Sequence, residues 1–187
     1  MAEQSVCPWW IGRLMASPLR KLIQDPSDLL GPFVRPGMTV LEPGPGMGFF
    51  TLELATLAGP RGRVVAVDVQ PKMIEGLRQR AERAGVIDRI ETHVVPATTM
   101  ALSGRESAFD FVLAFAVVHE MPSAETFFTE AGRAMKPGAS LLLVEPAGHV
   151  REDEFVRELA LAAQQGLLAS HGPQVWRSQT AVLQKKP

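Results

Sequence analysis

Short apolar runs alternate with segments of helical length along most of this chain. The apolar runs lie at about residues 38–43, 63–68, 90–95, 109–115 and 139–145. Runs with so few polar positions are typical of strands buried on both faces of a parallel sheet. Because helix-like segments fill the gaps, the sequence predicts an α/β fold of the doubly wound type, a mostly parallel sheet with helices on both faces.

Start and stop signals bound the expected helices. Pro71 suits the first turn of a helix, and Gly85 suits its C-terminal end. Ser123 is a good N-cap, and Glu125 follows in the first turn, where the helix dipole favours an acid. The expected helices span the residues after a glycine cluster up to 58, then 71–85, a short element near 98–102, and 124–136.

The pattern changes after the fifth strand. Residues 151–165 are predicted to form one more amphipathic helix, with apolar side chains at helical spacing at Phe155, Leu159 and Ala162 or Ala163. Two short strands follow, at about 167–171 and 178–184, and the link between them is too short for a crossover helix. These last two strands are therefore expected to form an antiparallel hairpin.

The segment VLEPGPGMGFF, residues 40–50, is an apolar strand that ends in Glu42 and continues into three closely spaced glycines. Glycines allow positive φ and a close approach of backbone to a ligand, and the helix that follows offers unpaired N–H groups. Residues 64–69, VVAVDV, form a second apolar strand with a single acid, Asp68, at its end. A strand, glycine loop, helix, strand and acid in this order predict a site for a nucleotide-like ligand.

Composition narrows the class of protein. The 187 residues fit one folded unit, 46% of them are hydrophobic, and the net charge is −1 with no basic cluster, so a nucleic-acid partner is not expected. The single Cys7 cannot form an internal disulfide, and neither a secretory signal nor a run of membrane-spanning length is visible. We therefore expect a cytoplasmic protein.

Four segments resemble, in order and spacing, the motifs of the class I S-adenosylmethionine-dependent methyltransferases, over roughly residues 37–185. VLEPGPGMG is similar to the first motif, an acid before GxGxG, and VVAVDVQPKM is similar to the second. FDFVLAFAVVHEMP resembles the fourth-strand motif of the small-molecule branch, and AMKPGASLLLVE resembles the family's LKPGGxLxxxE. The resemblance implies a Rossmann-like, seven-stranded sheet with an antiparallel C-terminal hairpin, and methyl transfer from S-adenosyl-L-methionine to a small-molecule acceptor.

The same resemblance implies which residues bind the methyl donor. Asp68 falls on the acid that takes the ribose hydroxyls, whereas Pro96 stands where the family commonly has an aspartate for the adenine amino group. Backbone groups near Ala97 and Thr98 are expected to substitute for that aspartate, and Met73 is either a wall of the adenine site or a plain core residue. The expected donor-binding residues are Glu42, Gly44, Pro45, Gly46, Gly48, Asp68, Val69, Met73, Ala97, Thr98 and Phe115.

Two other classes of function remain as alternatives. An NAD-dependent oxidoreductase also places an acid after a glycine loop, but its G-x-G-x-x-G fingerprint, counted from Gly44, needs a small residue where Phe49 stands. Pro45 and Met47 would also crowd a pyrophosphate. The other alternative is a catalytically inactive S-adenosylmethionine-binding protein that acts as a sensor or partner subunit.

His119 and Glu120 are the candidate catalytic residues. His119 lies at the family's first histidine position and could act as a general base, or it could simply cap the loop through backbone hydrogen bonds. Glu145 could bind a cationic acceptor, orient a histidine or cap a helix, and His149 is a further candidate for the substrate pocket. No metal is expected, because the four histidines and Cys7 lack the spacing of metal ligands.

Residues 1–36 are expected to form a helical lid or extension in front of a methyltransferase domain at residues 37–187. Trp9, Trp10 and Met15 would then line an apolar acceptor pocket. Alternatively, these side chains pack on the sheet edge, or meet a dimer partner or, less expected, a membrane surface. The acceptor is expected to be small, and the sequence leaves open whether carbon, oxygen, nitrogen or sulfur is methylated.

Overall fold

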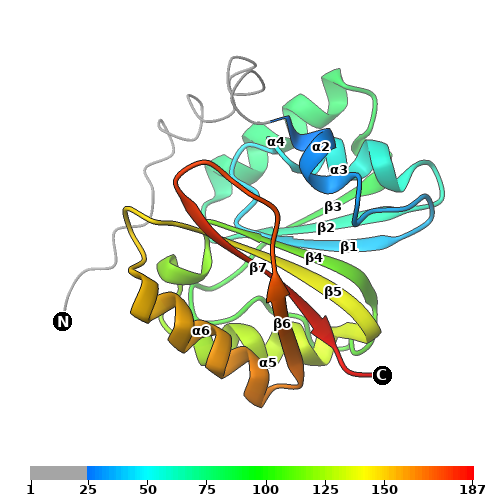
Figure 1. Ribbon diagram of the computed structural model, residues 1–187. Coiled ribbons are helices and arrows are strands. Elements are labelled where there is room, and N and C mark those ends of the chain that lie inside the picture. The colour runs from blue at the N-terminus through cyan, green and yellow to red at the C-terminus, as the bar shows by residue number, and fades with distance from the viewer. Residues whose placement is uncertain (1–24) are drawn as a thin grey trace. The chain divides into compact units, whose positions relative to one another are not determined.

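The computed structural model describes residues 25–187 and contains one seven-stranded sheet with the strand order β3-β2-β1-β4-β5-β7-β6 (Figure 1). The strands from β1 to β5 were expected to be parallel and the last two to form a hairpin, and both expectations are confirmed. The described chain divides into two compact units, residues 25–95 and 96–187, which are presented in turn.

The first unit, residues 25–95, carries three parallel strands with helices packed against them. β2 pairs with β1 on one side and β3 on the other, and α3 packs on β1 and β2 while α4 packs on β2 and β3 (Figure 1). Its elements are α2 (Pro26–Leu30), β1 (Thr39–Pro43), α3 (Thr51–Ala58), β2 (Arg63–Asp68), α4 (Pro71–Arg83), η2 (Ile87–Arg89) and β3 (Ile90–Val94).

The apolar pattern explains how these elements pack. In α4 the buried side chains recur three and four residues apart, which gives the helix one apolar stripe: Met73, Ile74, Leu77 and Ala81. Gly59 follows α3 with φ of 68°, a positive value that glycine adopts readily, and the helix ends at residue 58 as predicted. α2 packs against α3, and the predicted domain boundary at residue 36 stays a prediction.

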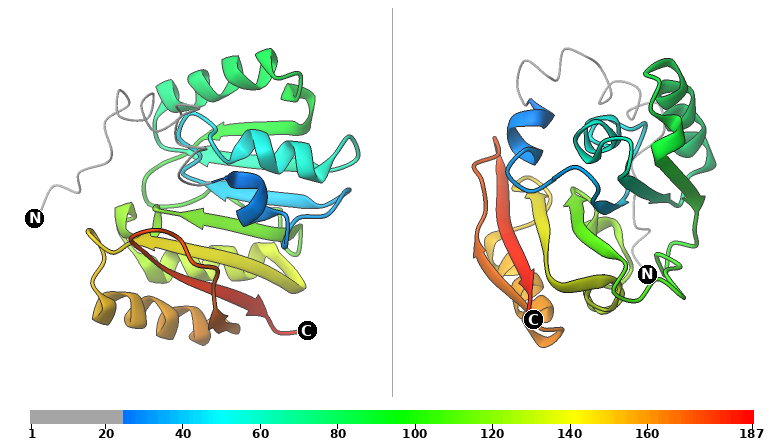
Figure 2. Two further views of the ribbon diagram at one scale, coloured as in Figure 1. Left: turned by 45° about the horizontal axis from the view of Figure 1, so that its top comes forward. Right: turned by 90° about the vertical axis from the view of Figure 1, so that its right-hand side faces the viewer.

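The second unit, residues 96–187, carries the other four strands. β4 and β5 are parallel, β7 is antiparallel to both β5 and β6, α5 packs on β5, and α6 packs on β6 and β7 (Figure 2). Its elements are β4 (Phe109–Phe115), η3 (Val118–Glu120), α5 (Ala124–Ala134), β5 (Met135–Pro146), α6 (Glu152–Gln164), β6 (Leu167–His171) and β7 (Ser178–Lys185).

The short helix expected near residues 98–102 is wrong, because this segment forms turns. The N–H of Met100 and the hydroxyl of Thr99 donate to the carboxylate of Glu130 on α5, at 2.7 and 2.5 Å. Ala101 has φ of 53°, which breaks any helix. Side-chain acceptors from α5 therefore replace the helical hydrogen bonds that the propensity of the segment suggested.

Two other boundaries differ from the expectation. α5 ends at Ala134 and not at residue 136, because β5 begins directly at Met135 and includes the Lys-Pro-Gly that looked like a helix stop. Lys136 Nζ donates to the carboxylate of Asp110 on β4 at 2.7 Å, which ties this start to the neighbouring strand. In α6 the acid Glu158 is buried where Leu159, only half-buried, was expected.

Candidate active site

The glycine loop connects β1 to α3 in the first unit. Gly44, Gly46 and Gly48 all have positive φ, at 64°, 53° and 82°, and Gly44 N–H donates to the carbonyl of Val67 on β2 at 2.9 Å. A Cβ at Gly46 would meet no atom within 4 Å, whereas one at Gly48 would lie 3.0 Å from side chains of two leucines. The loop therefore packs tightly at Gly48 and has open space beside Gly46.

Asp68 is the last residue of β2 and ties the second strand to the glycine loop. Its carboxylate accepts the N–H of Gln70 at 2.8 Å and backbone N–H groups of Gly46 and Val69. Burial raises the pKa of Asp68, and these N–H donors hold the pKa down in part. Asp68 is buried at the end of its strand, with 7% of the residue accessible.

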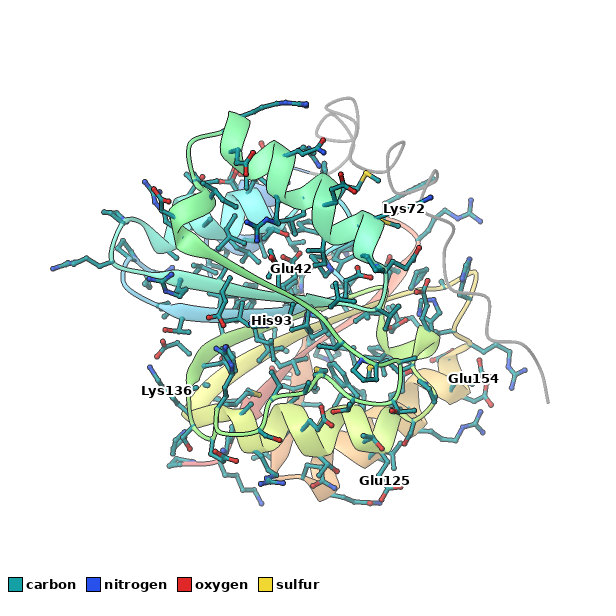
Figure 3. All side chains as sticks on the ribbon, turned by 180° about the vertical axis from the view of Figure 1, so that it is seen from behind. Glu42, Lys72, His93, Glu125, Lys136 and Glu154 are labelled. Atoms are coloured by element: carbon teal, nitrogen blue, oxygen red, sulfur yellow. The ribbon has the colours of Figure 1, made fainter. Side chains whose placement is uncertain are left out.

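Glu42 on β1 is buried in the interior of its unit, while Lys72 lies at the surface of α4 (Figure 3). Burial raises the pKa of Glu42 to about 8; the nearby hydroxyl of Thr51 lowers it in part, and the charge of Asp68 adds to the rise. Among residues 25–187, neither Glu42 Oε2 nor Thr51 Oγ1 has a hydrogen-bond partner. Both oxygens therefore retain hydrogen-bonding capacity for a polar ligand.

The remaining expected donor-binding residues occupy varied environments. Met73 is buried in the apolar stripe of α4, which fits the core alternative, and Val69 is half-buried just after β2. Ala97 and Thr98 are exposed in the turn that follows β3, and Phe115 is half-buried at the end of β4. Pro45 is buried in the turn that the N–H of Gly48 closes by donating to its carbonyl at 3.0 Å. Their contacts with a donor stay predictions.

In the second unit, His119 and Glu145 form a hydrogen-bonded pair. His119 lies on η3, directly after β4, and its Nδ1 hydrogen-bonds one carboxylate oxygen of Glu145, the residue before the last of β5. The other oxygen of Glu145 accepts the N–H of Val118 at 3.0 Å. Glu145 therefore orients the histidine and caps the 3₁₀ helix at once, two of the three roles considered for it.

The pair is shielded from solvent to different degrees. The Glu145 side chain is fully buried, while the His119 ring is 17% exposed. A carboxylate on Nδ1 favours the Nδ1–H tautomer, so Nε2 would carry the lone pair that accepts a proton. Nδ1 of His119 bonds a side-chain carboxylate and not the backbone, which disagrees with the alternative that His119 caps the loop through backbone hydrogen bonds. The catalytic role of His119 stays a prediction.

Three carboxyl groups act on the pKa of His119. Burial lowers this pKa, but the hydrogen bond and charge of Glu145, followed by the charges of Glu120 and Glu158, outweigh burial and raise the pKa above its ordinary value. Glu120 shares η3 with His119. The raised pKa means that His119 binds a proton more tightly than an ordinary histidine does.

Sequence reasoning missed Glu158 of α6. Burial raises its pKa to about 7, the charges of Glu145 and Glu154 add to the rise, and that of His119 lowers it. Its Oε2 has no hydrogen-bond partner in the described part of the chain. The available signal was its place on the buried stripe of the helix, between Phe155 and Ala162.

His149 lies on the exposed loop after β5 and approaches the catalytic candidate. Its ring meets that of His119 edge to face, with centroids 5.4 Å apart and an angle of 75°. Trp9, Trp10, Met15 and Cys7 lie outside the described residues. Over residues 25–187, no group of three or more potential metal ligands is found, and no helix is long and apolar enough to cross a membrane.

Comparisons with known proteins give one consistent picture. A family profile described as a methyltransferase domain matches residues 35–183. A ubiquinone/menaquinone biosynthesis C-methyltransferase UbiE from Brucella canis is 31% identical over 117 residues, 62% of this chain and 42% of that protein. A catechol O-methyltransferase from Mycobacterium tuberculosis is 49% identical over 75 residues, 39% of this chain and 33% of that protein. The chain thus spans less than half the length of either relative.

Solved structures support the same fold. The crystal structure of a SAM-dependent methyltransferase from Aquifex aeolicus superposes with a TM-score of 0.81 and 24% identity, covering 96% of this chain and 98% of that one. The [4+2]-cyclase SpnF superposes with a TM-score of 0.70 and 18% identity, over 86% of this chain and 80% of that one. At these identities the likeness shows the arrangement of strands and helices alone.

Proposed function

Because the chain belongs to the methyltransferase-domain family, we propose that it transfers a methyl group from S-adenosyl-L-methionine to a small-molecule acceptor. The observation that carries the proposal is the pairing of His119 with the buried carboxylate of Glu145. A histidine held in one orientation by a buried acid is suited to take a proton from an acceptor hydroxyl or acidic carbon.

Most of the proposed donor-binding residues belong to the first unit. Two features of these residues fit a polar ligand: the unpaired oxygens Glu42 Oε2 and Thr51 Oγ1, and the open space beside Gly46. Asp68 keeps capacity for ribose hydroxyls, since a carboxylate accepts about four hydrogen bonds. Val69 would flank the adenine, and Met73 would do so as well if it is more than a core residue. The other residues of the proposed donor set are Ala97, Thr98 and Phe115. When bound, S-adenosyl-L-methionine supplies a methyl group activated by its sulfonium.

The acceptor chemistry follows from the second unit. His119 Nε2 would receive the acceptor proton, and Glu145 would stabilise the imidazolium that results. Such a positioned base contributes roughly 10²- to 10⁴-fold to the rate. The names of the two relatives, a C-methyltransferase acting in quinone biosynthesis and a catechol O-methyltransferase, point to acceptors that lose a proton. We therefore favour a phenolic oxygen or an activated ring carbon, with Glu120 and His149 at the edge of the acceptor site.

The NAD-dependent alternative is disfavoured by Phe49. This side chain is buried, at the position where the dinucleotide fingerprint needs a small residue for close packing of helix and strand. An S-adenosylmethionine-binding protein without catalysis stays as the second candidate, because the features of the donor site do not depend on His119.

The test has two steps. Isothermal titration calorimetry of the full chain against S-adenosylmethionine, its demethylated product and NAD should show binding of the first two alone; binding of NAD alone would overturn the proposal. Methyl transfer from labelled donor to catechols and hydroquinones is then measured. Donor binding with no transfer to any acceptor would favour the catalytically inactive alternative.

Three expectations from the sequence stay as proposals alongside this function. They are the acceptor pocket at Trp9, Trp10 and Met15 within residues 1–36, the cytoplasmic location, and a homodimer. Size-exclusion chromatography with light scattering tests the homodimer directly, and Trp9→Ala tests the pocket through the acceptor KM.

A further inference from the structure

Helix α4 interlocks with the glycine loop through side-chain packing. A Cβ on Gly76 of α4 would lie 3.0 Å from Cγ and 3.1 Å from Sδ of Met47, so the absent side chain is what lets Met47 seat against the helix. One residue further along, Leu77 Cγ lies 3.0 Å from where a Cβ of Gly48 would be. Two consecutive residues of α4 thus meet two consecutive residues of the loop at contact distance.

Arg80 adds a polar bond on the same face of the helix. It lies four residues after Gly76, one turn along, and its Nη1 donates to the carbonyl oxygen of Met47 at 2.6 Å. The guanidinium is half-buried, and burial lowers its pKa without discharging it. A charge-assisted bond of this kind is stronger than one between neutral groups.

The bond from Arg80 fixes a peptide unit that matters for the loop. The Met47 carbonyl and the N–H of Gly48 belong to one planar peptide, so holding the oxygen also sets the direction of the N–H. That N–H closes the turn by donating to the carbonyl of Pro45 at 3.0 Å. Gly46, with open space beside it, lies inside this turn.

We infer that Arg80 and Gly76 are positioning residues for the methyl-donor site: they hold the Met47–Gly48 peptide so that the glycine loop stands ready to receive the donor. The inference rests on the proposed function, because it assigns these residues to the loop that would bind S-adenosylmethionine. Neither residue needs to touch the donor.

Arg80→Ala is the first test. Removing the guanidinium leaves the Met47 carbonyl without its donor, and we expect the dissociation constant for S-adenosylmethionine to rise about tenfold, as for the loss of one charge-assisted hydrogen bond. Arg80→Lys should recover part of the loss through its ammonium. Arg78→Ala is the matched control, since Arg78 lies on the same helix, is exposed and contacts Thr92 on β3 at 3.5 Å instead of the loop.

Gly76→Ala separates positioning from mere stability. Alanine is favoured over glycine inside a helix, which offsets the strain of a Cβ close to Met47, so the melting temperature should change little. The displaced Met47 should nevertheless weaken donor binding roughly threefold or more. If Gly76 had a purely structural role, the donor affinity of Gly76→Ala would change only as far as its melting temperature does. Arg80 and Gly76 variants that bind the donor as tightly as the wild type would overturn the inference alone, while a wild type that binds no donor would overturn the proposed function and the inference together.

Discussion

His119 on η3 and Glu145 near the end of β5 are 26 residues apart in sequence, and they meet in one hydrogen bond between the imidazole Nδ1 and a buried carboxylate. The same carboxylate accepts the N–H of Val118, so it cannot turn away from the ring without losing a backbone partner. The orientation of the proposed base is therefore built into the start of η3.

Replacing Glu145 by Gln should weaken both the charge and the orientation of this pair. The pKa of His119 should fall, since the hydrogen bond and charge of Glu145 raise it. If His119 acts as a base, its activity rises as pH increases through its pKa, so the rising limb of the rate profile should move to lower pH while the maximal rate falls roughly 10- to 100-fold. The pH–rate profile and an NMR titration of the ring measure this change, and an unmoved limb would contradict the assignment.

The same pair has a consequence for stability. Because the folded pKa of His119 lies above its unfolded value, its protonation stabilises the protein fully below about pH 6.5, and this contribution disappears as pH rises through the folded pKa. Denaturant unfolding measures this contribution in the wild type and in Glu145→Gln. The difference in free energy of unfolding between the two proteins should shrink as pH rises from below about pH 6.5 through the folded pKa of His119.

His119→Ala distinguishes a base from a residue that only binds. We expect kcat to fall about 10²- to 10⁴-fold, with donor affinity unchanged because His119 is not among the proposed donor-binding residues. His149→Ala is the neighbouring control: its ring is exposed and meets His119 only edge to face, so the loss should be several-fold at most. Equal turnover of His119→Ala and the wild type would remove the catalytic role.

Glu42→Gln should change how stability depends on pH. Because the folded pKa of Glu42 is raised to about 8, the folded protein keeps a proton on this group between about pH 4.5 and about pH 8, where the unfolded chain has released it. The free energy of unfolding therefore falls as pH rises through this range. Since one pKa unit corresponds to about 1.4 kcal/mol, the variant should lose a pH-dependent penalty of a few kcal/mol. Denaturant unfolding at about pH 5 and about pH 9 measures this penalty.

The control for Glu42 is Glu53→Gln, a half-buried acid in the first turn of the neighbouring helix α3. It measures what replacing a carboxylate by an amide does to stability at a neighbouring position. A Glu42→Gln protein that loses stability equally at both pH values would show that the carboxylate is charged and paired in the folded state.

Asp68→Ala should weaken donor binding at least tenfold and also lower the melting temperature. Its carboxylate accepts backbone N–H groups from Gln70 and from Gly46 of the loop, so those donors lose their partner along with the proposed ribose contact. Asp68→Asn, which retains an acceptor oxygen, should recover much of the stability. Asp88→Ala serves as the control, because Asp88 is exposed. Calorimetry measures donor affinity and thermal unfolding measures stability. If Asp68→Ala bound the donor as tightly as the wild type, the assignment of Asp68 would be wrong.

The strands were predictable because a buried parallel strand is a continuous apolar run: the expectation for 63–68 and 109–115 matches β2 and β4 to the residue. The start of β5 was not predictable, since Pro137 and Gly138 are residues that commonly follow the end of a helix. The turn at residues 98–102 depends on Glu130, thirty residues away. Local propensity carries no information about such a partner.

The site divides in the same way. Motif spacing placed Glu42, Asp68 and His119 at or just after strand ends, and it named Glu145 as an acid that could orient a histidine, but it could not choose this role over binding an acceptor or capping a helix. Arg80 was one of several arginines on a predicted helix, and only the fold brings it to Met47, 33 residues earlier. Long-range polar pairs are chosen by tertiary packing, which the sequence pattern of each element does not encode.

Glu158→Gln should act on His119 without touching its hydrogen bond. Five ionisable groups from three elements share this region: His119 and Glu120 on η3, Glu145 on β5, and Glu154 and Glu158 on α6. The charge of Glu158 contributes to the raised pKa of His119. Removing that charge should lower the His119 pKa by less than Glu145→Gln does, moving the activity limb slightly to lower pH with maximal rate nearly unchanged. Glu152→Gln, an exposed acid on the same helix, should leave the limb in place.

Stability supplies the second readout for Glu158. Its folded pKa of about 7 lies above that of the unfolded chain, so charging it costs stability as pH rises from about 4.5 to about 7, and Gln at this position should remove that loss. Above about pH 7 the variant should then be more stable than the wild type, because a buried carboxylate oxygen without a partner is replaced by a neutral group. A variant that is less stable at every pH, with an unshifted activity limb, would mean that Glu158 is charged and paired in the folded protein and does not act on His119.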